Sequence, residues 1–291
     1  IMLFCTVFMM YPRAEVSAKR IEEVFNLDPI IKNKPADSDF DEKVSIEFDH
    51  VTFVYPDGEE PVLQDVSFKA NKGEMIAFIG STGSGKSTLV NLVPRFYDVS
   101  SGSIKINGKD IRDYDVLELR DKLGVIPQKA VLFSGTIADN IRFGKKDASD
   151  EEVEYAAKVA QAYPFIMEKE NGFDEEISEG ATNVSGGQKQ RLSIARALVR
   201  KAQIYIFDDS FSALDFKTDA ILRKELKKEM TESIMLVVAQ RISSIMEADQ
   251  IIVLNEGKVV GKGTHHQLLK ECQIYHEIAT SQLSEEELAN A

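Results

Sequence analysis

The residues with the most evident chemistry form a glycine-rich loop of the pattern G-x-x-x-x-G-K-[ST]. Its glycines let the backbone curl tightly, so several N–H groups can point at one centre, as a nest for phosphate does. In this pattern Lys86 reaches the β- and γ-phosphates of a nucleotide, and the Ser87 hydroxyl holds Mg²⁺. A Gly/Ser-rich turn before a core helix is the alternative. The loop comprises Gly80, Ser81, Thr82, Gly83, Ser84, Gly85, Lys86, Ser87 and Thr88.

Two elements must position this loop. Residues 75–79 (MIAFI) are an apolar run that predicts a strand, and residues 89–93 predict a helix that begins inside the loop. The helix adds unpaired N-terminal amides and the positive end of its dipole. This strand–loop–helix setting argues against a simple turn.

A pair of carboxylates forms the second constellation. The apolar run 204–207 predicts a strand buried on both faces, and Asp208 and Asp209 follow it. They are therefore expected at the carboxyl end of the sheet, beside the phosphate loop. Asp208 suits the Mg²⁺ shell, and Asp209 lies where a general base for an attacking water would lie. An aspartate that caps the next helix explains Ser210 or Asp215 but not the adjacent pair.

A second anion-binding helix end is predicted where Ser185, Gly186, Gly187 and Gln188 begin the helical stretch 187–200. One nucleotide can hardly be held by two such helix ends of a single compact domain. A head-to-tail dimer, in which each Ser-Gly-Gly closes over the partner's nucleotide, resolves this.

Composition narrows the possibilities. The chain has 291 residues with 35 basic and 48 acidic side chains, a net charge of −13, which argues against a nucleic-acid partner. Cys5 and Cys272 are far apart, which suits a reducing compartment and gives no disulfide or zinc framework. His265 and His266 are adjacent in a predicted helix, and we expect both at the surface.

The N-terminal residues favour a membrane context. The first residue is Ile, which suggests a longer parent chain, and residues 1–11 are almost wholly apolar. A spanning helix needs about 20 such residues. With Arg13, Lys19 and Arg20 following, as on a cytoplasmic side, residues 1–28 are interpreted as the end of a last transmembrane helix. Residues 29–43 are the predicted linker. A short buried helix is the alternative.

Between these landmarks, apolar patterns predict strands at 44–48, 51–55, 62–70, 104–106, 123–127, 234–239 and 250–254. Helices are expected at 13–26, 136–163 (with breaks at Asn140 and Gly144), 216–230 and 241–247, and hairpin turns at 107–108 and 256–257. Strands alternate with helices after the loop, so a parallel α/β core with a small antiparallel layer before it follows.

Taken together, residues 44–280 resemble the nucleotide-binding domain of an exporter-type ABC transporter, with 281–291 as an acidic tail. Tyr55 matches the aromatic residue that stacks on adenine, residues 80–88 match Walker A, and Gln128 matches the Q-loop glutamine. The other matches are residues 185–188 (the signature motif, with Val184 where leucine is usual), Asp208 (Walker B), residues 212–215 (the D-loop) and Glu179 (the coupling loop).

The resemblance implies an α/β P-loop NTPase fold with a mostly parallel core sheet, an N-terminal antiparallel β subdomain and an α-helical signature subdomain. It implies ATP and Mg²⁺ as cofactors, with Ser87, Gln128 and Asp208 as metal ligands. The implied partners are a second ABC half-transporter chain and the transmembrane domain of this chain, with no nucleic acid. The implied location is the cytoplasmic face of the membrane.

Two positions depart from the family. Asp209 stands where the family has a glutamate base, and its carboxylate falls back by about 1.5 Å, one C–C bond. Gln240 replaces the switch histidine, and a glutamine cannot carry positive charge. With Gln128 and Lys86, these two form the predicted catalytic set. Misplacing a catalytic group by about 1 Å can cost on the order of a hundredfold in rate.

These departures suggest the half of a heterodimeric exporter that carries the degenerate site, binding ATP tightly and hydrolysing it slowly. A homodimeric exporter with weak ATPase and an ATP-gated module of a channel-like ABC protein remain open. A soluble ABC ATPase of DNA repair or translation fits residues 1–25 and the acidic charge less well. In another P-loop enzyme, such as a kinase, residues 185–191 would have no role.

Overall fold

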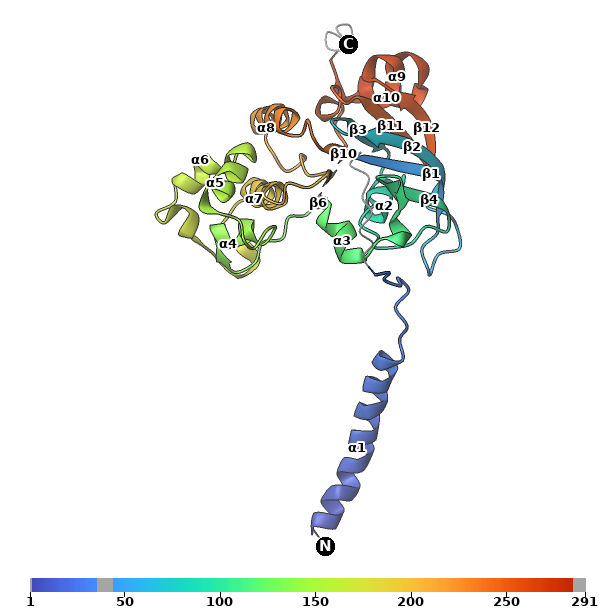
Figure 1. The fold of residues 1–291 in the computed structure, drawn as a ribbon, viewed down its shortest axis with the longest axis vertical. Helices are drawn as coiled ribbons and strands as arrows, with labels where there is room; N and C mark the ends of the chain where they lie inside the picture. Colours follow the sequence, from blue (N-terminus) through green and yellow to red (C-terminus); the bar gives the residue numbers. More distant parts are fainter. Residues whose placement is uncertain (1, 36–43, 285–291) are drawn as a thin grey trace. The chain divides into compact units, whose positions relative to one another are not determined.

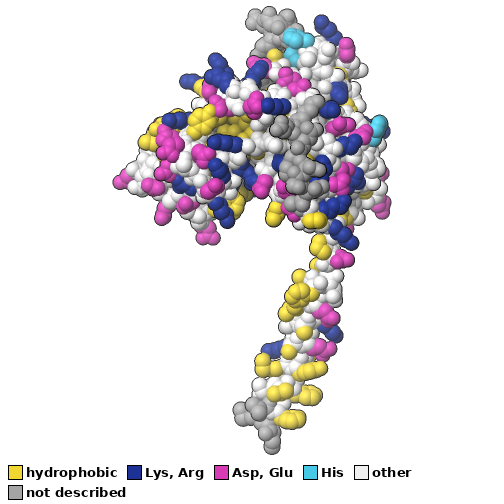
Figure 2. All heavy atoms as spheres, viewed as in Figure 1, with side chains coloured by type: hydrophobic (Ala, Val, Ile, Leu, Met, Phe, Trp, Pro, Cys, Tyr) yellow, Lys and Arg dark blue, Asp and Glu magenta, His cyan; other side chains and the backbone are white. Residues whose placement is uncertain are grey.

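The computed structural model describes residues 2–35 and 44–284 and divides into two compact units, Ile1–Asn33 and Lys34–Ala291. In the first unit the two predicted segments 1–11 and 13–26 form one helix, α1 (Met2–Phe25), with Pro12 inside it. Its apolar side chains are largely exposed, Phe4 by 82% and Phe8 by 78%, as Figure 2 shows along this helix. Of the described helices, none combines the length and the apolar character that crossing a bilayer requires. The boundaries at 28, 43 and 280 remain predictions.

A six-stranded sheet organises the second unit (Figure 1). Its order is β12-β11-β3-β10-β9-β6; the pairs from β11 to β6 are parallel, and β12 is antiparallel to β11. This confirms the predicted mostly parallel core. The strands are β3 (Met75–Gly80), β6 (Leu123–Ile126), β9 (Ile204–Asp208), β10 (Ile234–Val238), β11 (Gln250–Asn255) and β12 (Lys258–Gly263).

Alternate residues of these strands enter two different cores. Ile76 and Phe78 of β3 lie in the cluster shared with the antiparallel sheet, whereas Ala77 and Ile79 lie in the cluster shared with the helices. A strand buried on both faces reads as a continuous apolar run, which is why the sequence located the central strands well.

The predicted antiparallel layer is a four-stranded sheet of order β2-β1-β4-β5. The runs 44–48 and 51–55 were predicted as separate strands, but β1 is continuous. Its register shifts between Phe48 and Val51, where His50 has a φ of 50°. Such a bulge absorbs an extra residue without ending the strand. The strands are β1 (Ser45–Phe53), β2 (Leu63–Asn71), β4 (Ser101–Ile106) and β5 (Lys109–Asp110).

Helices complete the unit, and one group of them lies on the side of the sheet opposite the antiparallel layer (Figure 1). The tight turns at 107–108 and 256–257 have positive φ at all four residues, as a type I′ hairpin requires. The helices are α2 (Lys86–Leu92), α3 (Val116–Asp121), α4 (Ile137–Arg142), α5 (Asp150–Val159), α6 (Tyr163–Met167), α7 (Gly186–Leu198), α8 (Phe216–Glu229), α9 (His265–Glu271) and α10 (Gln273–Gln282).

Two helix predictions need correction. The stretch 136–163 is divided at residues 143–149, and Asn140 is not a break: its side chain bonds the backbone of Phe133 from within α4. The stretch 241–247 contains only a 3₁₀ turn, Ile242–Ser244, since Ile245 has a φ of −128°. Local apolar spacing predicted a helix there, but contacts from a distant helix fix the backbone instead, as described below.

Candidate functional site

The phosphate loop joins β3 to α2 in a conformation that only glycine fits at two points. A Cβ on Gly80 would lie 2.0 Å from the carbonyl oxygen of Leu254. At Gly85, where φ is 95°, it would lie 2.9 Å from the carbonyl oxygen of Val62. The loop is thus wedged against neighbouring backbone, and its curvature is fixed by contact as well as by sequence.

Lys86 folds back over this loop. Its Nζ donates to the carbonyl oxygens of Gly80 (2.8 Å) and Ser81 (2.7 Å) and to Ser84 Oγ (3.2 Å). Burial lowers the pKa of this ammonium, and the charges of Asp209 and Asp208 oppose that shift. A cation held inside a ring of backbone groups is placed to meet phosphate oxygens that enter the loop.

Ser87 and Asp208 are joined directly. Ser87 Oγ donates to Asp208 Oδ1 at 2.9 Å, across 121 residues of sequence. Burial raises the pKa of Asp208, and the charge of Asp209 adds to that effect. Among the described residues, no group of three or more His, Cys, Asp or Glu could hold a metal ion. The hydroxyl and carboxylate oxygens here suit Mg²⁺, which keeps water and phosphate among its ligands.

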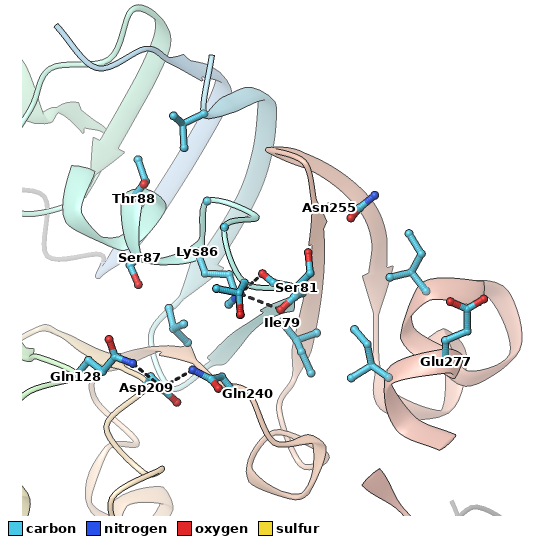
Figure 3. Close-up of a pocket in the computed structure, with 18 of the residues that line it drawn as sticks. Ile79, Ser81, Lys86, Ser87, Thr88, Gln128, Asp209, Gln240, Asn255 and Glu277 are labelled. Atoms are coloured by element: carbon cyan, nitrogen blue, oxygen red, sulfur yellow. Dashed lines mark hydrogen bonds between the residues drawn. The ribbon is translucent and has the colours of Figure 1, made fainter. Parts of the chain in front are cut away.

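Asp209 is held by two carboxamides. Its Oδ2 accepts from Gln128 Nε2 at 2.9 Å and from Gln240 Nε2 at 2.7 Å, with the two glutamines on opposite sides of the carboxylate (Figure 3). An ionised carboxylate only accepts hydrogen bonds, so both NH₂ groups must face it. Burial raises the pKa of Asp209, and the Gln128 hydrogen bond opposes the shift. The three residues follow β6, β9 and β10, which end at one edge of the sheet.

A cavity of about 830 Å³ lies over these groups. Gln128, Asp209 and Gln240 line it together with the predicted loop residues, except Ser84, which is buried beneath them. Asp208 is not among its lining residues and reaches the loop through Ser87. The volume is in the range of small-molecule sites.

Tyr55 approaches the loop from the antiparallel sheet. Its hydroxyl is 3.0 Å from Thr88 Oγ1, and its ring packs edge-on against Phe53 and Tyr97 at 4.8 and 5.2 Å between centroids. It stands beside the cavity and is not among the residues that line it. These contacts fix the position of the Tyr55 ring next to the loop.

Residues 185–188 lie elsewhere. Ser185 caps α7: its Oγ accepts from the Gln188 N–H at 3.3 Å, and the Ser185 N–H donates to Gln188 Oε1 at 2.9 Å. Ser185 and Gly186 are exposed, and none of the four residues is among those that line the cavity. Within one chain, the predicted second anion site and the phosphate loop are not brought together.

Sequence reasoning missed one wall of the cavity. Helix α10 contributes Ile274, Glu277, Ile278, Ser281 and Gln282 to the lining, and Asn255 is the last residue of β11 (Figure 3 labels Glu277 and Asn255). These residue types carry no motif, so no pattern could have found them.

Asp215 and His265 both have structural roles outside the cavity lining. Asp215 is an N-cap, accepting from the Thr218 N–H at 3.0 Å, which was the alternative weighed for it. His265 was expected at the surface, but it is 2% exposed and bonds Tyr275 Oη through Nδ1 at 2.7 Å. Its hydrogen bond to the buried Tyr275 lets His265 lie in the core. Of these two neighbouring histidines, His266 is the exposed one.

Comparison with known proteins places this geometry in context. Residues 63–212 match the family model described as ABC transporter. The chain is 44% identical over 276 residues to an uncharacterized ABC transporter ATP-binding protein of Mycobacterium tuberculosis, covering 93% of this chain and 47% of that protein. It is 43% identical over 286 residues to YfiB of Bacillus subtilis, an uncharacterized ABC transporter ATP-binding protein, covering 98% and 49%.

A putative multidrug export ATP-binding/permease protein of Staphylococcus aureus is 44% identical over 237 residues, covering 81% of this chain and 41% of that protein. Among solved structures, a bacterial Atm1-family ABC exporter with ATP bound superimposes with a TM-score of 0.90 at 33% identity, over 97% of this chain and 50% of that chain. The chain thus spans about half the length of the relatives it matches.

Proposed function

Because this chain belongs to the ABC transporter family, as the ATP-binding domain of an exporter-type protein, we propose that it binds Mg-ATP at the phosphate loop and hydrolyses it slowly. The observation that carries the slow step is the Asp209 carboxylate, held at one oxygen by both Gln128 and Gln240. A general base must lie within roughly 2.6–3.2 Å of its water. A short acid tied to two amides is poorly placed for that.

Each residue then has a role. Loop amides and Lys86 would hold the phosphates, Tyr55 would support adenine, and Ser87, Asp208 and Gln128 would hold a Mg²⁺ ion. The metal supplies charge neutralisation to the phosphates when it is bound. Burial beneath the loop strengthens these electrostatic contacts relative to water.

The signature motif of this chain, residues 185–188, serves a second chain in a head-to-tail dimer. Its exposure and its absence from the residues lining this chain's own cavity support that assignment. The partner chain supplies the glutamate base and the switch histidine, which are replaced by Asp209 and Gln240 in this chain. The two chains form a heterodimeric exporter, and this domain lies at the cytoplasmic face of the membrane. Transport of a substrate is driven mainly by the partner's site.

The experiment is equilibrium binding of Mg-ATP together with single-turnover hydrolysis by the purified chain. We expect ATP to bind and to be cleaved slowly, and Lys86→Ala to abolish most of the binding. Lys72→Ala is the matched control, because Lys72 is an exposed surface lysine paired with Glu232. Rapid hydrolysis by the wild-type chain would refute the slow-site proposal. A native mass that shows two identical chains would favour the homodimer instead.

A further inference from the structure

The inference concerns Gln282, the last residue of α10, and it rests on the proposed function. Its side chain bonds a distant stretch of backbone at two points. Gln282 Nε2 donates to the Gln240 carbonyl oxygen at 2.9 Å, and Gln282 Oε1 accepts from the Ile242 N–H at 2.8 Å. One carboxamide therefore spans residues 240–242, the segment that follows β10.

Gln240 is consequently fixed at both ends. Its backbone carbonyl is held by Gln282, and its side chain donates to Asp209 Oδ2 at 2.7 Å. Gln240 is exposed at the cavity wall. The residues after it form one 3₁₀ turn, in which Ile242 is fully buried, and Arg241 Nη2 donates to the Ser212 carbonyl oxygen at 3.4 Å. The hydrogen bonds from Gln282 add a further constraint on the backbone of Gln240 itself.

Helix α10 is itself firmly seated. Tyr275 and Ala279 are fully buried, and Tyr275 Oη bonds the buried His265. The other face of the helix, including Glu277 and Ser281, lines the nucleotide cavity. The helix thus provides a rigid support from which an exposed glutamine reaches the catalytic segment.

We propose that Gln282 is a positioning residue, which ties α10 to residues 240–242 and so orients Gln240 toward Asp209 and the terminal phosphate. Gln282 is one of the residues that line the cavity, but its two hydrogen bonds run to the backbone of residues 240 and 242. It acts through Gln240, so the C-terminal helix becomes part of the nucleotide-sensing machinery. Because both glutamines are exposed, the tie competes with water and can be broken at small cost.

Two variants separate the two hydrogen bonds. Gln282→Ala removes both, whereas Gln282→Glu keeps the acceptor for the Ile242 N–H and loses the donor to Gln240. Gln273→Ala is the matched control on the same helix, because the Gln273 amide donates to Glu277 within α10, at 2.9 Å, and Gln273 is not among the residues that line the cavity.

The test measures Mg-ATP affinity, and amide hydrogen exchange at Ile242 by NMR without nucleotide. We expect Gln282→Ala to weaken ATP binding about fivefold, the scale of one lost hydrogen bond, and to speed exchange at Ile242. Gln282→Glu should weaken binding while Ile242 stays protected. Gln273→Ala should change neither quantity.

A double-mutant cycle with Gln240→Ala distinguishes positioning from general stability. If Gln282 acts through the Gln240 side chain, Gln282→Ala has little further effect on binding in the Gln240→Ala background. Equal losses in both backgrounds would overturn the proposal, as would wild-type affinity in Gln282→Ala. If the wild-type chain binds no ATP, the proposed function fails instead, and the exchange rate at Ile242 still decides whether the tie exists.

Discussion

At Asp209 the backbone has a φ of 48°, an uncommon value for a residue other than glycine. Its N–H donates to Val238 O, its carbonyl accepts from Ser212 Oγ at 2.8 Å, and its carboxylate takes both glutamine amides. This residue is thus fixed on every side. Such strain is retained where the surroundings over-determine it, and it concentrates at functional sites.

The loop glycines give a matched pair for mutation. Gly83 and Gly85 both have positive φ, of 83° and 95°, so alanine costs about 1–2 kcal/mol in conformation at either. Only at Gly85 does an added Cβ meet neighbours, Leu63 Cδ2 at 2.8 Å and Val62 O at 2.9 Å; at Gly83 nothing lies within 4 Å.

We therefore predict that Gly85→Ala lowers the free energy of unfolding by clearly more than Gly83→Ala, measured by urea denaturation. Gly85→Ala should also weaken ATP binding, since the loop must shift to relieve the clash. Equal stabilities for the two variants would show that the loop is not wedged as described.

Among the helices, two begin with the same kind of serine cap, but only one of these serines has a proposed functional role. Ser185 and Ser149 both form capping boxes, at the starts of α7 and α5. Replacing either serine with alanine should cost about 1 kcal/mol of stability.

We predict that the two variants differ in function. In the proposed dimer, Ser185→Ala should reduce hydrolysis at the partner's site, because we propose that this serine acts there as part of the signature motif. Ser149→Ala, with a matched loss of stability, should leave hydrolysis unchanged. Parallel ATPase assays of the two dimers check this, and equal activities would remove the signature role.

Helix α5 is also tied to its surroundings by charge. The Glu152 carboxylate accepts hydrogen bonds from Lys201 Nζ at 2.8 Å and from Lys145 Nζ at 2.9 Å. These two lysines, with the Ser149 N–H, lower the pKa of Glu152 from 4.5 to about 2. A lowered carboxyl pKa contributes stability that is present above pH 4.5 and is lost as the pH falls toward about 2.

Glu152→Gln should therefore lower Tm at neutral pH, and the difference from wild type should shrink as the pH falls below 4.5 toward about 2. Thermal unfolding across this range measures it. Because the ion pairs of Glu152 with the two lysines are solvent-accessible, the Tm difference should also become smaller at high salt. A Tm difference independent of pH would assign the effect to packing.

Local patterns explain what the sequence could predict. The strand ending in Asp208 and the glycine loop are each encoded by a short run of neighbouring residues. What the sequence could not show depends on contacts between distant elements. The bulge at His50, the burial of His265 by Tyr275 and the Gln282 bond to residue 242 are of this kind.

At the scale of the whole molecule, acidic and basic side chains are interspersed on the face shown in Figure 2. The net charge of −13 is the basis of the prediction that nucleic acid is not a partner, and this stays a prediction. The chain spans about half the length of the relatives that it matches. Selection of the transported substrate is therefore proposed only for the full transporter.

We propose that Asp209 and Gln240 together make ATP hydrolysis at this site slow. The most direct measurement is single-turnover ATP hydrolysis by wild type, Asp209→Glu, Gln240→His and the double variant. We expect slow cleavage by the wild type and a gain on the order of a hundredfold in the double variant, because glutamate reaches further than aspartate and the amide of Gln240 is replaced by an imidazole. Fast wild-type cleavage, or a double variant no faster than wild type, would contradict it.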